Sequence, residues 1–224
     1  MPDNPEQLIL ELDLAPRLTE EDFLVGSSNQ IGWDLITGWP EWSDSIAILV
    51  GPEGSGKTHL ASIWQSRTDA LNLNPGEIKP DMVYEFRHQK ALIIEDIDKT
   101  AFDENMLFHL LNLVRISRIS VLITARSKPQ SWHIKTKDLL SRLRMAPVFE
   151  LKPPDDPLLR AVIVKLFLDR QLVIDTEIVE YLARRIERSF AKAKEIVALL
   201  DKEAMKSGRR ITRPMVSQIM KTMM

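Results

Sequence analysis

The chain has 224 residues, of which 44% are hydrophobic and 28% charged, with 30 basic side chains against 32 acidic ones and no cysteine. This length and apolar content suffice for one large domain, or for one domain and a smaller second one, and they exclude a mainly disordered chain. The absence of cysteine excludes disulfides, a cysteine-based zinc site and a cysteine nucleophile.

Hydropathy and charge give no sign of a membrane or export signal. No stretch approaches the roughly 18 consecutive apolar residues that span a bilayer, and the N-terminus MPDNPEQLILELDL is acidic where a secretory signal is basic. We therefore expect a soluble, cytoplasmic protein with no membrane partner. Residues 184–224 hold eleven basic and four acidic side chains, which suits a phosphate-containing or acidic partner, although the pattern favours a solvated helical surface.

The first twenty residues are predicted to form an extended tail, because they contain three prolines and no helical period. Residues 7–12 (QLILEL) alternate apolar and polar side chains, as short extended segments do. The composition becomes globular from Asp22, and residues 45–50 (SIAILV) are predicted to be a buried strand.

Strands and helices then alternate along the chain. This order predicts an α/β fold with a parallel sheet that is covered on both faces. Residues 72–80 are expected to be a loop because of their Asn, Gly and Pro content. The remaining predicted strands are residues 91–94, 119–124 and 148–151, and the predicted helices are residues 58–68, 104–117 and 138–143.

After Pro153-Pro154 the pattern becomes purely helical. We predict three domains or segments: a tail over residues 1–20, an α/β domain over 21–153 and a small all-helical domain over 154–224. Gly208 is expected to break the last helices apart. The predicted helices of this domain are residues 155–170, 175–187, 190–206 and 213–223.

The phosphate-binding pattern GxxxxGK[ST] is matched without departure by GPEGSGKT, between a predicted strand and a predicted helix. Its glycines let backbone N–H groups turn toward phosphate oxygens. Lys57 supplies a charge for the terminal phosphates, and the Thr58 hydroxyl suits Mg²⁺. We expect ADP or ATP with Mg²⁺ here. The predicted nucleotide-binding residues in this loop are Gly51, Pro52, Glu53, Gly54, Ser55, Gly56, Lys57 and Thr58.

Two carboxylates, Glu95 and Asp96, follow the predicted strand at residues 91–94. Ligands of open α/β sheets bind outside the carboxyl ends of the strands. We predict Glu95 as a magnesium ligand and Asp96 as the group that polarises an attacking water.

These motifs together resemble the AAA+ ATPases, and within them the replication-initiator branch that contains DnaA and its Hda-type regulators. The match runs from about residue 23 to about residue 200, and the N-terminal wording is closest to α-proteobacterial Hda. The segments that carry the resemblance are 23–29 (FLVGSSN), 51–60 (GPEGSGKTHL), 92–98 (LIIEDID), 139–143 (LLSRL) and 186–190 (IERSF).

The resemblance implies a regulator of replication initiation without the DNA-binding domain of DnaA. By analogy, Arg142 is an arginine finger donated in trans to the ATP held by DnaA, and Arg188 is the second sensor that contacts the nucleotide. The tail resembles the QLxLxL motif that docks on the DNA sliding clamp. Its anchors would be Gln7, Leu8, Leu10 and Leu12.

The sequence also departs from the family pattern. The order Glu95-Asp96 replaces Asp-Glu or Asp-Asp, so intrinsic ATP hydrolysis is expected to be weak. The region of the first sensor reads Thr124-Ala125-Arg126, where Asn or Asp is usual, which leaves Thr124 as the candidate.

Several alternatives stay open at this point. Arg142 could be an ordinary surface charge, Arg188 an ion-pair partner within the helical domain, and residues 7–12 a strand that packs on the core. The whole chain could be an autonomous P-loop ATPase or kinase, a non-catalytic adaptor of DnaA, or a DNA-binding helper that uses its basic end, which is the less favoured reading. Self-association is also open.

Overall fold

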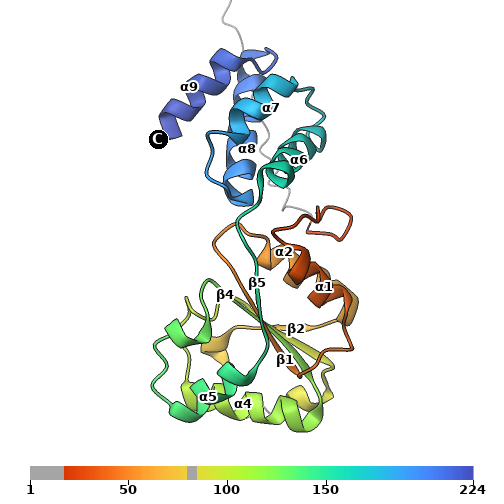
Figure 1. Cartoon of the computed structure of the whole chain (residues 1–224), viewed down its shortest axis with the longest axis vertical. Helices are drawn as coiled ribbons and strands as arrows, with labels where there is room; N and C mark the ends of the chain where they lie inside the picture. Colours follow the sequence, from red (N-terminus) through yellow and green to blue (C-terminus); the bar gives the residue numbers. More distant parts are fainter. Residues whose placement is uncertain (1–17, 80–84, 224) are drawn as a thin grey trace, which may run out of the picture.

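The computed structural model describes residues 18–79 and 85–223, which form a parallel sheet with helices on both faces and a helical lid at its carboxyl edge (Figure 1). The strands are ordered β2-β3-β4-β1-β5, and every neighbouring pair is parallel. The predicted α/β fold class is thereby confirmed. The strands are β1 (Ile46–Val50), β2 (Leu71–Leu73), β3 (Ala91–Ile94), β4 (Ser120–Ala125) and β5 (Val148–Glu150).

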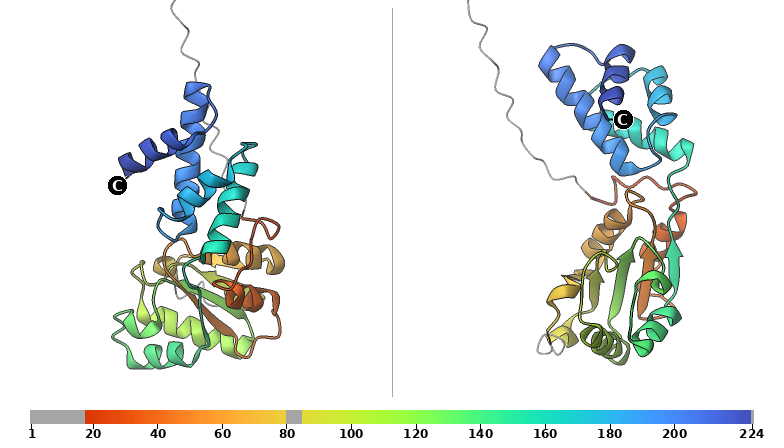
Figure 2. Two further views of the ribbon diagram at one scale, coloured as in Figure 1. Left: turned by 45° about the horizontal axis from the view of Figure 1, so that its top comes forward. Right: turned by 90° about the vertical axis from the view of Figure 1, so that its left-hand side faces the viewer.

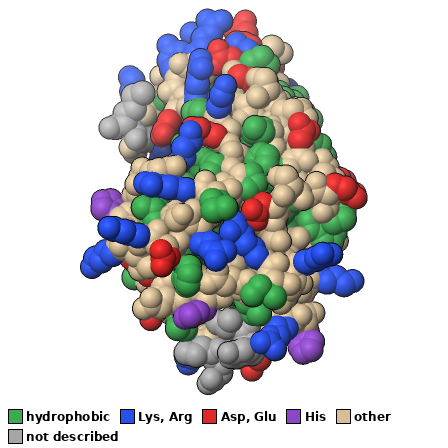
Figure 3. Space-filling view, turned by 60° about the horizontal axis from the view of Figure 1, so that its bottom comes forward, with side chains coloured by type: hydrophobic (Ala, Val, Ile, Leu, Met, Phe, Trp, Pro, Cys, Tyr) green, Lys and Arg blue, Asp and Glu red, His purple; other side chains and the backbone are tan. Residues whose placement is uncertain are grey.

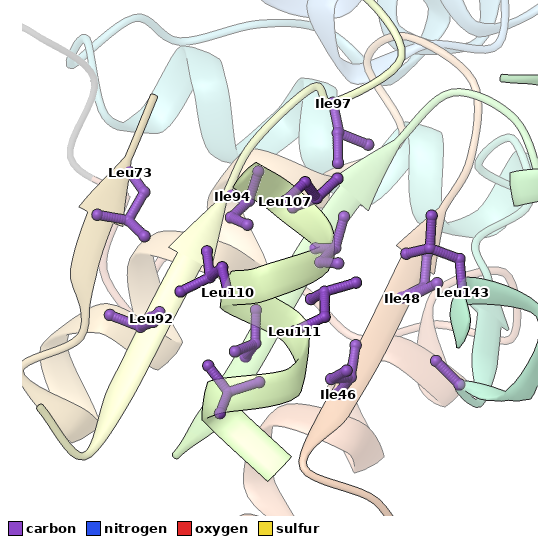
Figure 4. Close-up of a cluster of buried hydrophobic side chains, with 14 of the residues drawn as sticks. Ile46, Ile48, Leu73, Leu92, Ile94, Ile97, Leu107, Leu110, Leu111 and Leu143 are labelled. Carbon is purple, nitrogen blue, oxygen red and sulfur yellow. The ribbon is translucent and has the colours of Figure 1, made fainter. Parts of the chain in front are cut away.

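Alternation of side chains along the central strands builds a separate core on each face of the sheet. In β1, Ile46 and Ile48 pack toward one face, whereas Ala47 and Leu49 pack toward the other. Figure 4 shows the first of these clusters, in which side chains of β1 and β3 meet those of α4. The helices on this face are α4 (Glu104–Ser117) and α5 (Lys137–Met145), and those on the opposite face are α1 (Gln30–Thr37) and α2 (Lys57–Thr68).

Helix α4 forms where its sequence predicts, because apolar residues recur at spacings of three and four. Leu107, Leu110, Leu111 and Val114 are all buried against the sheet. The helix is capped by Asp103, whose side chain accepts hydrogen bonds from two first-turn N–H groups at 2.8 and 3.2 Å. One apolar stripe and one cap therefore fix both its position and its start.

The lid packs its four helices around a core of its own. Asp155 and Ser189 cap α6 and α8, and Gly208, with φ +62°, ends α8 in the left-handed conformation. The four predicted helices are confirmed. They are α6 (Asp156–Leu168), α7 (Thr176–Ala183), α8 (Phe190–Ser207) and α9 (Arg213–Met223). Figure 2 shows from two further directions that the lid stands over one end of the sheet domain.

Two elements differ from the sequence prediction. Helix α1 was not predicted, and its Gly32 lies so close to Leu151 and Leu60 that a Cβ atom would come within 2.6 and 2.7 Å of their methyl groups. Strand β2 occupies part of a segment predicted as a loop. It has three residues and pairs with β3 alone, so its composition carries little strand signal.

Within residues 18–79 and 85–223, no helix combines the length and the apolar character needed to cross a membrane.

Candidate nucleotide-binding site

The phosphate loop connects β1 to α2 and has the backbone shape that its glycines predict. Gly54 and Gly56 have φ angles of +71° and +99°, a region that side chains disfavour. Helix α2 begins at Lys57, so its first N–H groups lack partners within the helix and border the loop. The loop therefore presents backbone donors and the positive end of a helix, which suits an anion.

Lys57 is folded into this loop. Its side-chain nitrogen donates to the carbonyl oxygens of Gly51 and Pro52 at 2.8 and 2.9 Å, and only 6% of the residue is exposed. Burial lowers the pKa of the Lys57 ammonium below its usual range, and the nearby carboxylate of Asp96 opposes that shift. An anion bound in the loop would act like Asp96 and favour the charged form of the Lys57 ammonium.

The acid pair lies at the end of β3, beside β4. Asp96 has a φ of +50°, and its N–H donates to the hydroxyl of buried Thr124 at 3.0 Å. Thr124 thus holds the backbone of the second carboxylate. Lys99 pairs with the Asp96 carboxylate at 2.6 Å, and Glu95 accepts from Asn72 at 3.4 Å. Sequence reasoning missed Lys99, which only the turn after β3 brings back to Asp96.

The residues present fit a nucleotide and its cation. The Ser55 hydroxyl oxygen is buried and lacks a hydrogen-bond partner among the described atoms, although it faces the turn of the loop. Thr58 is exposed at the start of α2. No cluster of three or more His, Asp or Glu side chains suited to a metal occurs in the described part of the chain. This donor set suits Mg²⁺, which takes few protein ligands and completes its shell with phosphate oxygens and water.

The lid reaches the phosphate loop through the start of α8. The N–H of Phe190 donates to the carbonyl oxygen of Gly54 at 2.8 Å. A Cβ atom on Gly54 would lie 2.1 Å from the Ser189 hydroxyl oxygen, so this approach requires glycine. Apart from the glycine itself, no pattern in the sequence signals this contact.

The segment FLVGSSN before the loop joins the sheet domain to the lid. Asn29 is buried, and its side chain accepts from the N–H of Gly26 at 2.7 Å and donates to the carbonyl of Leu24 at 2.9 Å. The Ser27 hydroxyl donates to Asp155, the cap of α6. These polar residues therefore fix the backbone of this segment and attach it to the start of the lid.

The two arginines predicted as functional lie elsewhere. Arg188, 60% exposed on its side chain, pairs with Asp156 at 2.7 Å within the lid. Arg142 lies on α5, and its guanidinium carbon is 5.8 Å from the centre of the Phe108 ring on α4. Lys and Arg side chains are spread over the end of the molecule to which these helices belong (Figure 3). The four tail anchors, Gln7, Leu8, Leu10 and Leu12, lie outside the described residues.

Comparison with known proteins agrees with this architecture. The model of the family "Hda, lid domain" matches residues 163–220. Domain III of the replication initiation protein DnaA from Thermotoga maritima superimposes with a TM-score of 0.77 at 20% identity, over 92% of this chain and 97% of that one. Residues 163–220 thus match an Hda-type lid domain, and the chain shares the fold of domain III of DnaA.

Two further structures share the fold. AMPPCP-bound DnaA from Aquifex aeolicus gives a TM-score of 0.72 at 17% identity, over 88% of this chain and 68% of that one. The Holliday junction branch migration motor RuvB from Thermotoga maritima gives 0.68 at 20% identity, over 88% and 70%. The fold of this chain is therefore shared with structures of DnaA and of the RuvB motor.

Proposed function

We propose that the chain binds an adenine nucleotide, docks on the DNA sliding clamp and stimulates hydrolysis of the ATP held by DnaA. The nucleotide would lie between the phosphate loop, the acid pair and the start of α8. Backbone N–H groups of the loop and Lys57 would bind its phosphates, and Thr58 with Glu95 would hold Mg²⁺. Bound Mg²⁺ neutralises phosphate charge.

The location of Arg142 is the observation that carries the regulatory part of the proposal. Arg142 is half-buried on α5, and it stacks on Phe108 on the side of the sheet that α4 and α5 cover. An arginine held there suits donation to a second protein. A guanidinium supplied to a transferring phosphoryl group can raise the rate by roughly a thousandfold or more.

Weak turnover by the chain itself is part of the same proposal. Lys99 neutralises the Asp96 carboxylate, which is the group expected to polarise water. Arg188 would have to leave Asp156 to reach a nucleotide. We therefore propose a nucleotide-bound activator of DnaA, with Gln7, Leu8, Leu10 and Leu12 as the clamp anchors.

The test is single-turnover hydrolysis of ATP already bound to DnaA, with DNA-loaded clamp, ADP and this protein added. Arg142→Ala and a Gln7, Leu8 and Leu10 triple alanine variant should each abolish the stimulation. Arg144→Ala is the matched control, because Arg144 is an exposed arginine on the same helix. Stimulation that survives Arg142→Ala would favour the adaptor, and no stimulation by the unmodified chain with active partners would refute the regulator.

A further inference from the structure

Four arginines of the lid have no acidic partner. They are Arg185, Arg209, Arg210 and Arg213, all exposed, and none forms an ion pair or a side-chain hydrogen bond with a residue in 18–79 or 85–223. Each of the other four lid arginines pairs with an Asp or a Glu. The charge pattern of the sequence favours a solvated surface, because it does not reveal which arginines are paired. Positive charge that the fold itself leaves without a partner is available to an external anion.

Tyr181 brings two of these arginines together from different helices. The guanidinium carbon of Arg185, just after α7, lies 3.9 Å from the centre of the Tyr181 ring, and that of Arg213, at the start of α9, lies 5.2 Å from it. The two cations are thus at most about 9 Å apart and repel each other. The ring orients them, since a cation over an aromatic face is attracted to it. A bound anion would offset the repulsion.

The loop between α8 and α9 supplies the other two arginines. Gly208 ends α8 and Ile211 is buried, so Arg209 and Arg210 occupy an exposed loop only a few residues before Arg213. Figures 1 and 2 show this loop at the end of the lid that is remote from the sheet domain. We call the four residues the lid arginine cluster. It extends along the lid from the end of α7 to the start of α9.

The surroundings of the cluster suit a nucleic acid better than an acidic protein. Protein interfaces are built around an apolar centre, yet no exposed large apolar side chain of the described chain lies in α7 or in residues 209–222. Guanidinium groups bind phosphate through paired N–H donors, and DNA offers closely spaced phosphates along a rod. Asp175 and Glu177 line one cavity with Arg213 but do not pair with it, so they weaken the attraction for an anion without occupying its donors.

We propose that the lid arginine cluster binds the phosphate backbone of duplex DNA without reading the base sequence. The Tyr181 ring is already covered by guanidinium groups, so it does not serve as a stacking platform for unpaired bases. The contact is therefore electrostatic, and its strength falls as the salt concentration rises. The inference goes beyond the proposed regulation of DnaA, and it requires neither a nucleotide nor the clamp.

The experiment measures the fluorescence anisotropy of a labelled DNA duplex as the full chain is added, without nucleotide or clamp. Four phosphate contacts predict that log K falls against log salt with a slope of about −3.6, so the affinity should fall roughly a hundredfold between about 50 and 200 mM salt. Arg185→Gln combined with Arg213→Gln should reduce the slope to about −1.8. Arg185→Lys combined with Arg213→Lys keeps both charges and should keep most of the slope.

The matched control is Lys137→Gln combined with Arg144→Gln. These two exposed cations of α5 carry the same total charge, but they lie in the sheet domain. The control variant should bind the duplex with the slope of the unmodified chain. Urea denaturation of every variant checks that the fold is retained.

Three results would overturn the inference: no binding of the duplex by the unmodified chain at about 50 mM salt, an equal loss of slope in the control and the cluster variants, or binding of polyglutamate as tight as that of the duplex. Tighter binding of a single strand than of the duplex would overturn the assignment to duplex DNA. None of these results bears on the proposed function, which is tested by hydrolysis of the ATP held by DnaA. Absence of that stimulation, with DNA binding retained, refutes the proposed function alone.

Discussion

Substitution of Gly54 by alanine tests whether the lid is seated on the phosphate loop. Two separate costs follow from the structure. The φ of +71° places alanine in the left-handed region, at about 1 kcal/mol. The new methyl group would also meet the Ser189 hydroxyl oxygen at 2.1 Å and the Ala191 Cβ and N atoms at 3.0 Å. The start of α8 must then move away and lose the hydrogen bond from Phe190, at about 1 kcal/mol more.

Gly208 provides the matched control for this substitution. It has a φ of +62°, yet nothing lies within 4 Å of the Cβ atom that alanine would add. Gly208→Ala therefore carries the backbone strain alone, about 1 kcal/mol. We expect Gly54→Ala to lower the free energy of unfolding by about 2 to 3 kcal/mol, as measured by urea denaturation without nucleotide.

A second substitution identifies the clash as the cause. Ser189→Gly removes the hydroxymethyl group, and glycine is nearly as good a helix cap as serine. In a double-mutant cycle, Ser189→Gly should restore part of the stability that Gly54→Ala loses. If Gly54→Ala costs no more than Gly208→Ala, the lid does not rest on the loop in the free protein, and the reasoning fails.

Three further predictions concern stability and use urea denaturation as the measurement. Leu110→Ala should cost about 2 to 5 kcal/mol, because the side chain is fully buried, whereas Ile116→Ala on the same helix, 82% exposed, should stay within about 0.5 kcal/mol; equal costs would contradict the core assignment. Thr124→Val should cost about 1 to 3 kcal/mol, because it leaves the N–H of Asp96 without its acceptor; no loss would show that this bond is dispensable. Asp155 accepts hydrogen bonds that hold its pKa below 3.8, so its charge stabilises the fold above that pH, and the contribution disappears as the pH falls through the lowered pKa. Asp155→Asn should thus be less stable at pH 7, with the difference shrinking as the pH falls below 3.8; a constant difference would argue against linkage.

The sheet was predictable where its strands are buried on both faces. Strands β1 and β3 are uninterrupted apolar runs, and β4 is apolar except for Ser120 and Thr124; the predicted bounds of each agree to within about one residue. Helix α1 is not predicted by the sequence pattern because Gly32 lowers helix propensity. The glycine is needed because Leu60 and Leu151 lie close to it, and that contact exists only in the folded protein. The local sequence pattern therefore predicts which strands are buried, but it does not predict close contacts between residues that are distant in the sequence.

The same distinction separates the parts of the candidate site. The phosphate loop was readable because its glycines and Lys57 act within eight consecutive residues. Glu53 of the loop pairs with Arg126, 73 residues away, and Lys99 lies in a turn, so neither ion pair has a pattern in the sequence. The family resemblance predicts that Arg188 contacts the nucleotide, whereas the structure pairs it with Asp156. Contact with a nucleotide would require Arg188 to leave Asp156.

The positions of the two proposed activities imply that they can be separated by mutation. The phosphate loop contacts the lid directly through Gly54 and Phe190. Arg142 instead belongs to α5, whose Leu143 is packed in the core on the opposite face of the sheet from α2. On the proposed function, Lys57→Ala should raise the concentration of this protein that half-saturates ATP hydrolysis by DnaA, because nucleotide acts through the lid. Arg142→Ala should lower the plateau rate instead, because a finger acts on the transition state. If titrations of both variants lose plateau rate at unchanged half-saturation, nucleotide and finger act at one place, and the separation drawn from the fold is wrong.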